Sequence, residues 1–102
     1  MSTATYRASF FDAETGTHET YKFEAENDLF RRPADDVVDR FIGYMNVENS
    51  YGHPLSYELN SAVKKNDMRI VMASGSLLLE RGEIPFMVMI SPELREITVQ
   101  VP

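Results

Sequence analysis

The chain has 102 residues, 43% of them hydrophobic and 25% charged, which suits one compact domain with a buried core and is too short for two. It has no cysteine, so disulfides, thiolate chemistry and cysteine-bound zinc are excluded. The formal net charge is −6, and basic residues are adjacent only at Arg31-Arg32 and Lys64-Lys65, which argues against binding to a nucleic-acid backbone.

We expect residues 1–102 to form a single domain. The first residues do not resemble a secretory leader, and no stretch of eighteen apolar residues occurs. The sequence therefore predicts a cytoplasmic protein that neither crosses nor binds a membrane.

The first hairpin is predicted from strands near residues 4–11 and 19–25, joined by a two-residue turn at Thr15-Gly16. Gly16 can supply the positive φ that such a turn requires. With this turn, Phe10 lies opposite Tyr21, so apolar side chains pair across the two strands.

One amphipathic helix is predicted from Pro33 to about Asn46, because apolar residues recur there at spacings of three and four. Pro33 suits the first turn, and Asp35 and Asp36 complement the positive end of the helix dipole. The apolar face consists of Val37, Val38, Phe41, Ile42, Tyr44 and Met45.

Three further turns divide the rest of the chain into strands. A turn at Asn66-Asp67 places Val63 opposite Ile70, and a turn at Arg81-Gly82 pairs the strands on either side of it. A proline turn at residues 91–94 predicts a last strand that returns beside residues 84–88.

Between these hairpins the inward apolar positions change from even numbers, such as Met72, to odd numbers, such as Leu77. Either a β-bulge in one long strand or a short hairpin at Ser74-Gly75 accounts for the change, and the central glycine favours the bulge. The predicted fold is α+β with the order β-β-α-β-β-β-β. Its antiparallel sheet of about six strands is strongly bent or partly barrel-like, and one amphipathic helix packs on the inner face.

The outer face of this predicted sheet is polar except around Leu78, Met87 and Met89. Methionine adapts well to irregular partner surfaces, and exposed apolar groups of this kind mark interaction sites. We therefore interpret the three residues as an interface, most simply that of a two-fold homodimer. The alternative is that the chain's own termini or loops cover them, or that bending creates a second core.

The loop Tyr51-Gly52-His53-Pro54 joins the helix to the sheet and brings a phenol and an imidazole together. Tyr51 and His53 are therefore candidate ligand-binding residues in an alternative function, a small-molecule-binding protein or simple enzyme with a pocket between sheet and helix. No second histidine or cysteine lies at ligand spacing, so no metal site is predicted.

No phosphate-binding glycine loop, nucleophile elbow or zinc-protease motif occurs in the sequence. We accordingly predict no catalytic residue and no cofactor. The leading hypothesis is a small cytoplasmic interaction module, not an enzyme, that associates with itself or with another protein through the outer sheet face.

Overall fold

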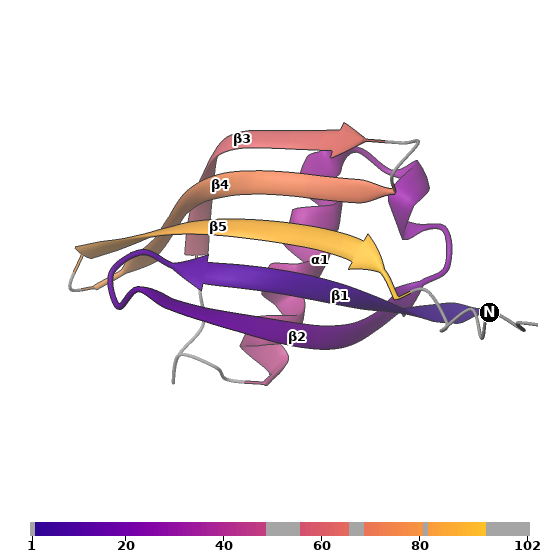
Figure 1. The fold of residues 1–102 in the computed structure, drawn as a ribbon, viewed down its shortest axis with the longest axis horizontal. Coiled ribbons are helices and arrows are strands. Elements are labelled where there is room, and N and C mark those ends of the chain that lie inside the picture. The colour runs from indigo at the N-terminus through magenta and orange to yellow at the C-terminus, as the bar shows by residue number, and fades with distance from the viewer. Residues whose placement is uncertain (1, 49–55, 66–68, 81, 94–102) are drawn as a thin grey trace, which may run out of the picture.

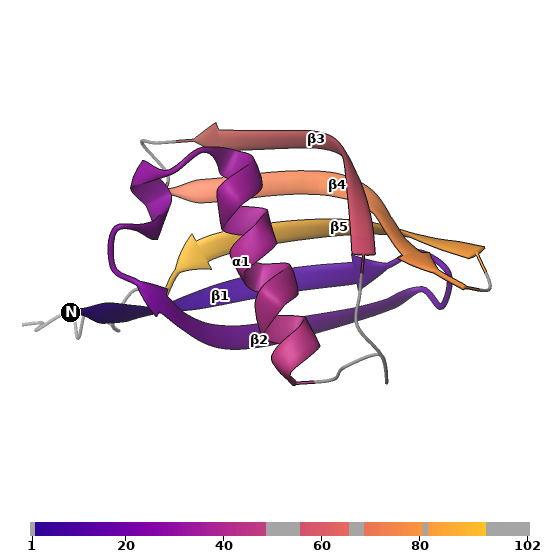
Figure 2. The ribbon, with the colours of Figure 1, turned by 180° about the vertical axis from the view of Figure 1, so that it is seen from behind.

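The computed structural model describes residues 2–48, 56–65, 69–80 and 82–93. Its elements are β1 (Thr3–Asp12), β2 (Thr17–Glu26), the 3-10 turn η1 (Leu29–Arg31), α1 (Ala34–Val47), β3 (Ser56–Lys65), β4 (Ile70–Leu79) and β5 (Gly82–Pro92). The five strands form one antiparallel sheet in the order β2-β1-β5-β4-β3. Helix α1 crosses one face of this sheet obliquely (Figure 1 and Figure 2). The α+β class with one helix on the inner face is confirmed.

The sheet is open, so the prediction of a partly closed barrel is wrong. Strands β2 and β3 are its two edges and are not paired with each other. The described residues contain five strands, and the predicted sixth strand lies outside them. Phe86 and Val88 of β5, to which that strand was assigned, are paired with β1 on one side and with β4 on the other.

The predicted proline turn at residues 91–94 is also wrong where the structure describes it. Ser91 and Pro92 continue β5 and pair with β1. The N–H of Glu93 then donates to the carbonyl oxygen of Thr5 at 2.9 Å. Proline is tolerated at this strand end because its missing N–H removes only one donor from the ladder.

The first hairpin has the predicted strands and faces, but its register differs by two residues. Tyr6, not Ala8, lies opposite Phe23. The connection is longer than two residues because the Asp12 carboxylate accepts hydrogen bonds from the N–H groups of Glu14, at 2.9 Å, and Thr15, at 3.2 Å. An aspartate whose carboxylate accepts hydrogen bonds from the N–H groups two and three residues later in the chain stabilises a wider turn.

The two later hairpins show the same kind of difference. Val63 lies opposite Met72 in the β3–β4 pair, and Leu77 lies opposite Ile84 in the β4–β5 pair. A shift of two residues leaves every side chain on its own face of the sheet, since the side-chain period of a strand is two. The register shift by itself therefore changes only the partners across the strands.

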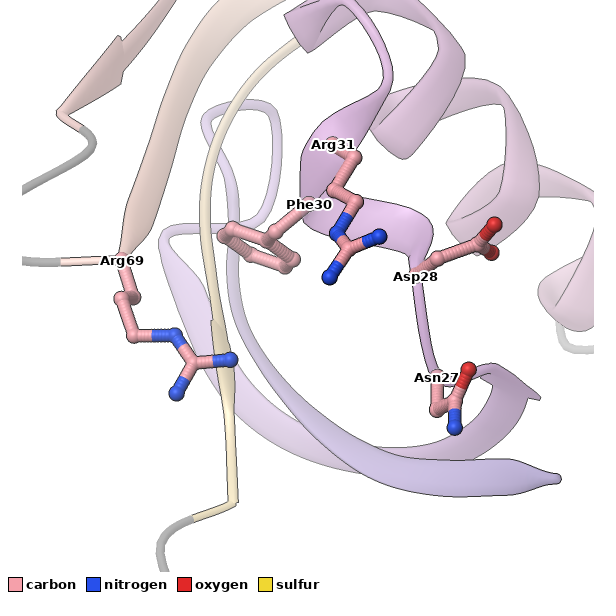
Figure 3. A pocket seen from close by; sticks show the side chains of 5 residues that line it. All are labelled: Asn27, Asp28, Phe30, Arg31 and Arg69. Atoms are coloured by element: carbon pink, nitrogen blue, oxygen red, sulfur yellow. The ribbon is translucent and has the colours of Figure 1, made fainter.

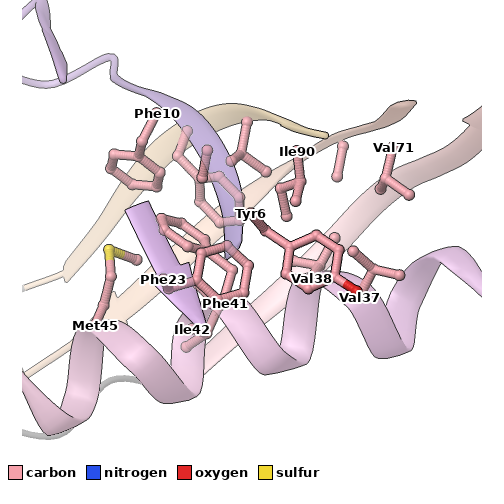
Figure 4. Close-up of a cluster of buried hydrophobic side chains, with 14 of the residues drawn as sticks. Tyr6, Phe10, Phe23, Val37, Val38, Phe41, Ile42, Met45, Val71 and Ile90 are labelled. Atoms are coloured by element: carbon pink, nitrogen blue, oxygen red, sulfur yellow. The ribbon is translucent and has the colours of Figure 1, made fainter. Parts of the chain in front are cut away.

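The core lies between α1 and the inner face of the sheet. Phe41 of α1 is fully buried, and its ring centroid lies 5.9 Å from that of Phe10 and 5.7 Å from those of Tyr21 and Phe23. Figure 4 shows the side chains of α1 directed toward those of the strands. The helix begins one residue after Pro33 and ends one residue after Asn46, so its predicted bounds are confirmed within a residue at each end.

Strand β4 overturns the predicted change of inward positions. Odd-numbered residues from Val71 to Leu77 point inward without interruption, and Met72 points outward. Two of these inward residues, Ala73 and Gly75, are small. Neither a bulge in β4 nor a hairpin at Ser74-Gly75 is present.

The irregularity lies instead in β3, where Asn60 is one residue extra between the pairs Leu59–Gly75 and Ser61–Ser74. Such a bulge bends the strand that carries it, and Figure 2 shows β3 turning sharply along its length. A Cβ atom at Gly75 would overlap the carbonyl oxygen of Glu58. Glycine at this position therefore lets the backbone of β3 fold closely over β4.

Polar contacts tie the helix to both edges of the sheet. The Tyr57 hydroxyl of β3 donates to Asp39 of α1 at 2.8 Å, and partial burial together with this hydrogen bond raises the pKa of the phenol. On the β2 side, Arg40 of α1 lies 3.2 Å from the Glu26 carboxylate. A hydrogen bond from the backbone N–H of Glu26 itself and the positive charge of Arg40 lower the pKa of the Glu26 carboxyl.

Truncating the central aromatic side chain of α1 tests the packing of helix on sheet. Phe41→Ala should lower the free energy of unfolding by about 3–5 kcal/mol, because it leaves a cavity among four other aromatic rings. Val47→Ala on the same helix is the control, since Val47 is 83% exposed. Equal stabilities of the two variants in denaturant unfolding would contradict this packing.

A pair of glycine substitutions tests the close approach of β3 to β4. Gly75→Ala should destabilise the protein by about 1–3 kcal/mol or more, because the new methyl group meets backbone that cannot rotate away. Gly43→Ala, in α1 with nothing within 4 Å of the new methyl group, should stabilise it by about 0.5–1 kcal/mol. Urea unfolding of both variants gives the comparison, and a neutral Gly75→Ala would refute the crowding.

Candidate interaction surface

The outer face of the sheet is left uncovered by α1. Along β5 the residues alternate strictly, with Ile84, Phe86, Val88 and Ile90 buried against the helix side and the odd-numbered residues between them exposed. This alternation is expected of an antiparallel sheet with one face on the core. A large apolar residue at an outward position is therefore not covered by the helix.

Five such residues form what we call the outer apolar surface: Phe11, Val63, Met72, Met87 and Met89. Their exposed fractions range from 37% for Phe11 to 58% for Met87. The described residues contain six exposed large hydrophobic side chains, and only Val47, at the end of α1, lies elsewhere. The exposed apolar side chains are thus concentrated on one face.

The sheet register makes this surface continuous. Val63 of β3 lies opposite Met72 of β4, which lies opposite Met89 of β5. One step along the strands, Met87 of β5 lies opposite Phe11 of β1. Outward residues that are opposite on neighbouring strands have Cβ atoms about 4.5–5.5 Å apart, so these side chains are close neighbours.

The predicted interface residues are only partly brought together. Met87 and Met89 occupy the middle of the outer apolar surface. Leu78 lies on the same face but is half-buried and sits opposite Glu83, four residues along β5 from Met87. Leu78 is therefore separate from the two methionines.

Sequence reasoning missed Met72 and Val63 as members of this surface. It assigned Met72 to the core, and the bulge at Asn60 reverses the faces of β3 beyond it, so Val63 points outward. The place of Phe11 beside Met87 depends on the pairing of β1 with β5. The small size of Ala73 and Gly75 was the available signal that β4 packs tightly on its odd-numbered side.

Small serine side chains lie next to much of the outer apolar surface. Ser9, Ser61, Ser74 and Ser76 occupy neighbouring outward positions. Charged side chains follow at one end, where Lys65 comes after Val63 on β3 and where Glu93 lies 2.8 Å from Lys22 and 3.4 Å from Arg7. The hydrogen bond from Lys22 and the positive charges of both partners lower the pKa of the Glu93 carboxyl.

The other predicted site falls outside the described residues. Tyr51 and His53 lie in the segment 49–55, and the small-molecule site proposed there stays a prediction. Within residues 2–48, 56–65, 69–80 and 82–93, no three His, Cys, Asp or Glu side chains gather closely enough to hold a metal ion. In the same part of the chain, no helix has the length and apolar character needed to span a membrane.

Comparison of the chain with models of protein families, with curated proteins and with solved structures found no match.

Mild peroxide oxidation tests which methionines are exposed. Met72, Met87 and Met89 should be oxidised several-fold faster than the fully buried Met45, because oxidation of the thioether follows its exposure. Peptide mass spectrometry of dilute protein gives the individual rates. If Met72 proved as slow as Met45, the assignment of even-numbered residues of β4 to the outer face would be wrong.

Proposed function

We propose that this protein is an interaction module that self-associates, its outer apolar surface packing against that of a second copy in a two-fold homodimer. The observation that carries the proposal is the concentration of five exposed large apolar side chains in one continuous group over β3, β4, β5 and β1. Removing such area from water contributes about 25 cal/mol per Å2, which favours association.

The shape of the surface supports a second copy as the partner. Two rows of outward residues cross the sheet: Val63, Met72, Met89 and Ser9 in the first, and Ser61, Ser74, Met87 and Phe11 in the second. We place a two-fold axis between the two facing sheets, perpendicular to the strands and midway between the two rows. Each residue of one row in the first copy then lies over the residue of the other row on the same strand of the second copy. Three of the four resulting contacts then bring a large side chain against a serine.

These contacts explain why self-pairing is favourable. Met72 of one copy faces Ser74 of the other, Phe11 faces Ser9, and Val63 faces Ser61, while Met87 meets Met89. Large side chains thus enter the spaces above small ones, as in the interdigitated layer between two sheets packed about 10 Å apart. The methionines in the centre can adjust to the angle between the twisted sheets.

Charge at the two ends of the face supports the same axis. Beyond the first row lie Lys65, Arg7 and Lys22, with the single carboxylate of Glu93 between the last two, and beyond the second row lie Glu58 and, further along β5, Glu83. The two-fold axis brings the basic end of one copy over the acidic end of the other. Electrostatic complementarity of this kind sets orientation and opposes other arrangements.

Sedimentation velocity over a wide concentration range tests self-association. The unmodified protein should show a concentration-dependent dimer. Met87→Lys combined with Met89→Lys should raise the dissociation constant at least about hundredfold, because four like charges would be buried together.

Val47→Lys is the matched control, since it adds a charge at an exposed apolar residue outside the outer apolar surface. It should leave the sedimentation behaviour unchanged, and circular dichroism should show that all variants are folded. An unmodified protein that stays monomeric throughout, or a dimer that the double variant does not weaken, would overturn the proposal.

A further inference from the structure

A second feature, separate from the outer apolar surface, gathers positive charge at the opposite side of the sheet. The Lys64 ammonium of β3 donates to the carbonyl oxygens of Phe30, at 3.0 Å, and Arg32, at 2.9 Å. This contact brings Lys64 to the Arg31-Arg32 pair at one corner, whereas the adjacent Lys65 points to the outer face. In a protein of net charge −6, such a corner is a local exception.

Beside this corner lies a cavity of about 200 Å3, lined by Asn27, Asp28, Phe30, Arg31 and Arg69. Figure 3 shows that four of the five side chains come from η1 and the residues just before it, and that Arg69 comes from the start of β4. The volume is below the 300–1,000 Å3 usual for drug-sized ligands, so it suits a small group.

One wall of the cavity, the half-buried ring of Phe30, is held in place by a buried contact, and the other four lining residues are exposed. The Phe30 ring stacks on Tyr6 with centroids 5.6 Å apart, and the Tyr6 hydroxyl donates to the carbonyl oxygen of Glu26 at 2.7 Å. Arg69 has a left-handed backbone, with φ of +52°, which a residue other than glycine adopts infrequently. The Arg69 side chain extends away from β4, at the side of the cavity across from Arg31 (Figure 3).

The two arginines of the cavity have no counter-charge of their own. Neither forms an ion pair with any residue that the structure describes, whereas neighbouring Arg32 lies 3.8 Å from the Glu26 carboxylate. Asp28 lines the same cavity, so the lining carries one net positive charge. Unpaired guanidinium groups at a cavity wall are suited to binding an oxyanion in two-pronged fashion.

We propose that this cavity binds the phosphate group of a small molecule through Arg31 and Arg69. A carboxylate offers two oxygens, which one guanidinium fork satisfies, whereas a phosphate offers three or four and can accept from both arginines. Asn27 can add an amide donor. The site does not depend on the proposed dimer, because none of its residues belongs to the outer apolar surface.

Titration with inorganic phosphate, followed by amide chemical shifts at constant ionic strength, tests the site. Saturable shifts should appear at residues 27–31 and 69. Arg31→Gln and Arg69→Gln should each raise the dissociation constant about tenfold or more, as expected for the loss of a charged hydrogen-bonding partner.

Two variants distinguish specific binding of phosphate in the cavity from a general attraction of phosphate to positive charge. Lys65→Gln removes the same charge from a side chain that does not line the cavity, and should change the dissociation constant less than twofold. Asp28→Asn should tighten binding, because it removes a repelling carboxylate that makes no side-chain cap of η1. Absence of saturable shifts, or equal effects of Lys65→Gln and Arg31→Gln, would overturn the site, and acetate binding as tightly as phosphate would overturn its assignment to phosphate.

Discussion

The close approach of β3 to Gly75 is the constraint on which the rest of the sheet depends. Because the carbonyl of Glu58 occupies the space of a side chain at Gly75, β3 bends over β4, and the extra residue Asn60 absorbs the bend. The bend brings Tyr57 to Asp39 of α1. The bulge also reverses the faces of β3, so that Val63 joins the outer face.

Much of this fold was predictable from periodicity, and less of it from pairing. The helix and the faces of the first hairpin follow from which positions are apolar, since burial of one face specifies them. Which residues lie opposite each other on two strands depends on the geometry of the turn between them. The wide turn stabilised by Asp12 shifts the register of the first hairpin by two residues. Strand order was not predictable, because β1 pairs with β5, a contact between opposite ends of the chain that leaves no local pattern.

The candidate surface was predicted in part for the same reasons. Met87 and Met89 alternate with buried residues of β5 and could be recognised from the sequence. Met72 could not, since the rule that places large apolar residues inside fails at β4, where the inward positions include Ala73 and Gly75 and the backbone of β3 closes over Gly75. The cavity beside Arg31 and Arg69 was equally hidden, because it arises where the start of β4 meets η1, forty residues earlier in the chain. Its arginines carry no sequence motif.

The bulge at Asn60 also limits the addition of further copies of the protein at the edges of the sheet. An open sheet ends in two rows of unpaired backbone groups, and a flat edge strand would allow copies to add side by side into a fibre. At one edge, β3 is kinked by the extra residue and cannot receive a straight strand along its length. With one edge of the sheet blocked in this way, strand addition cannot propagate through both edges, and growth of an endless ribbon is disfavoured.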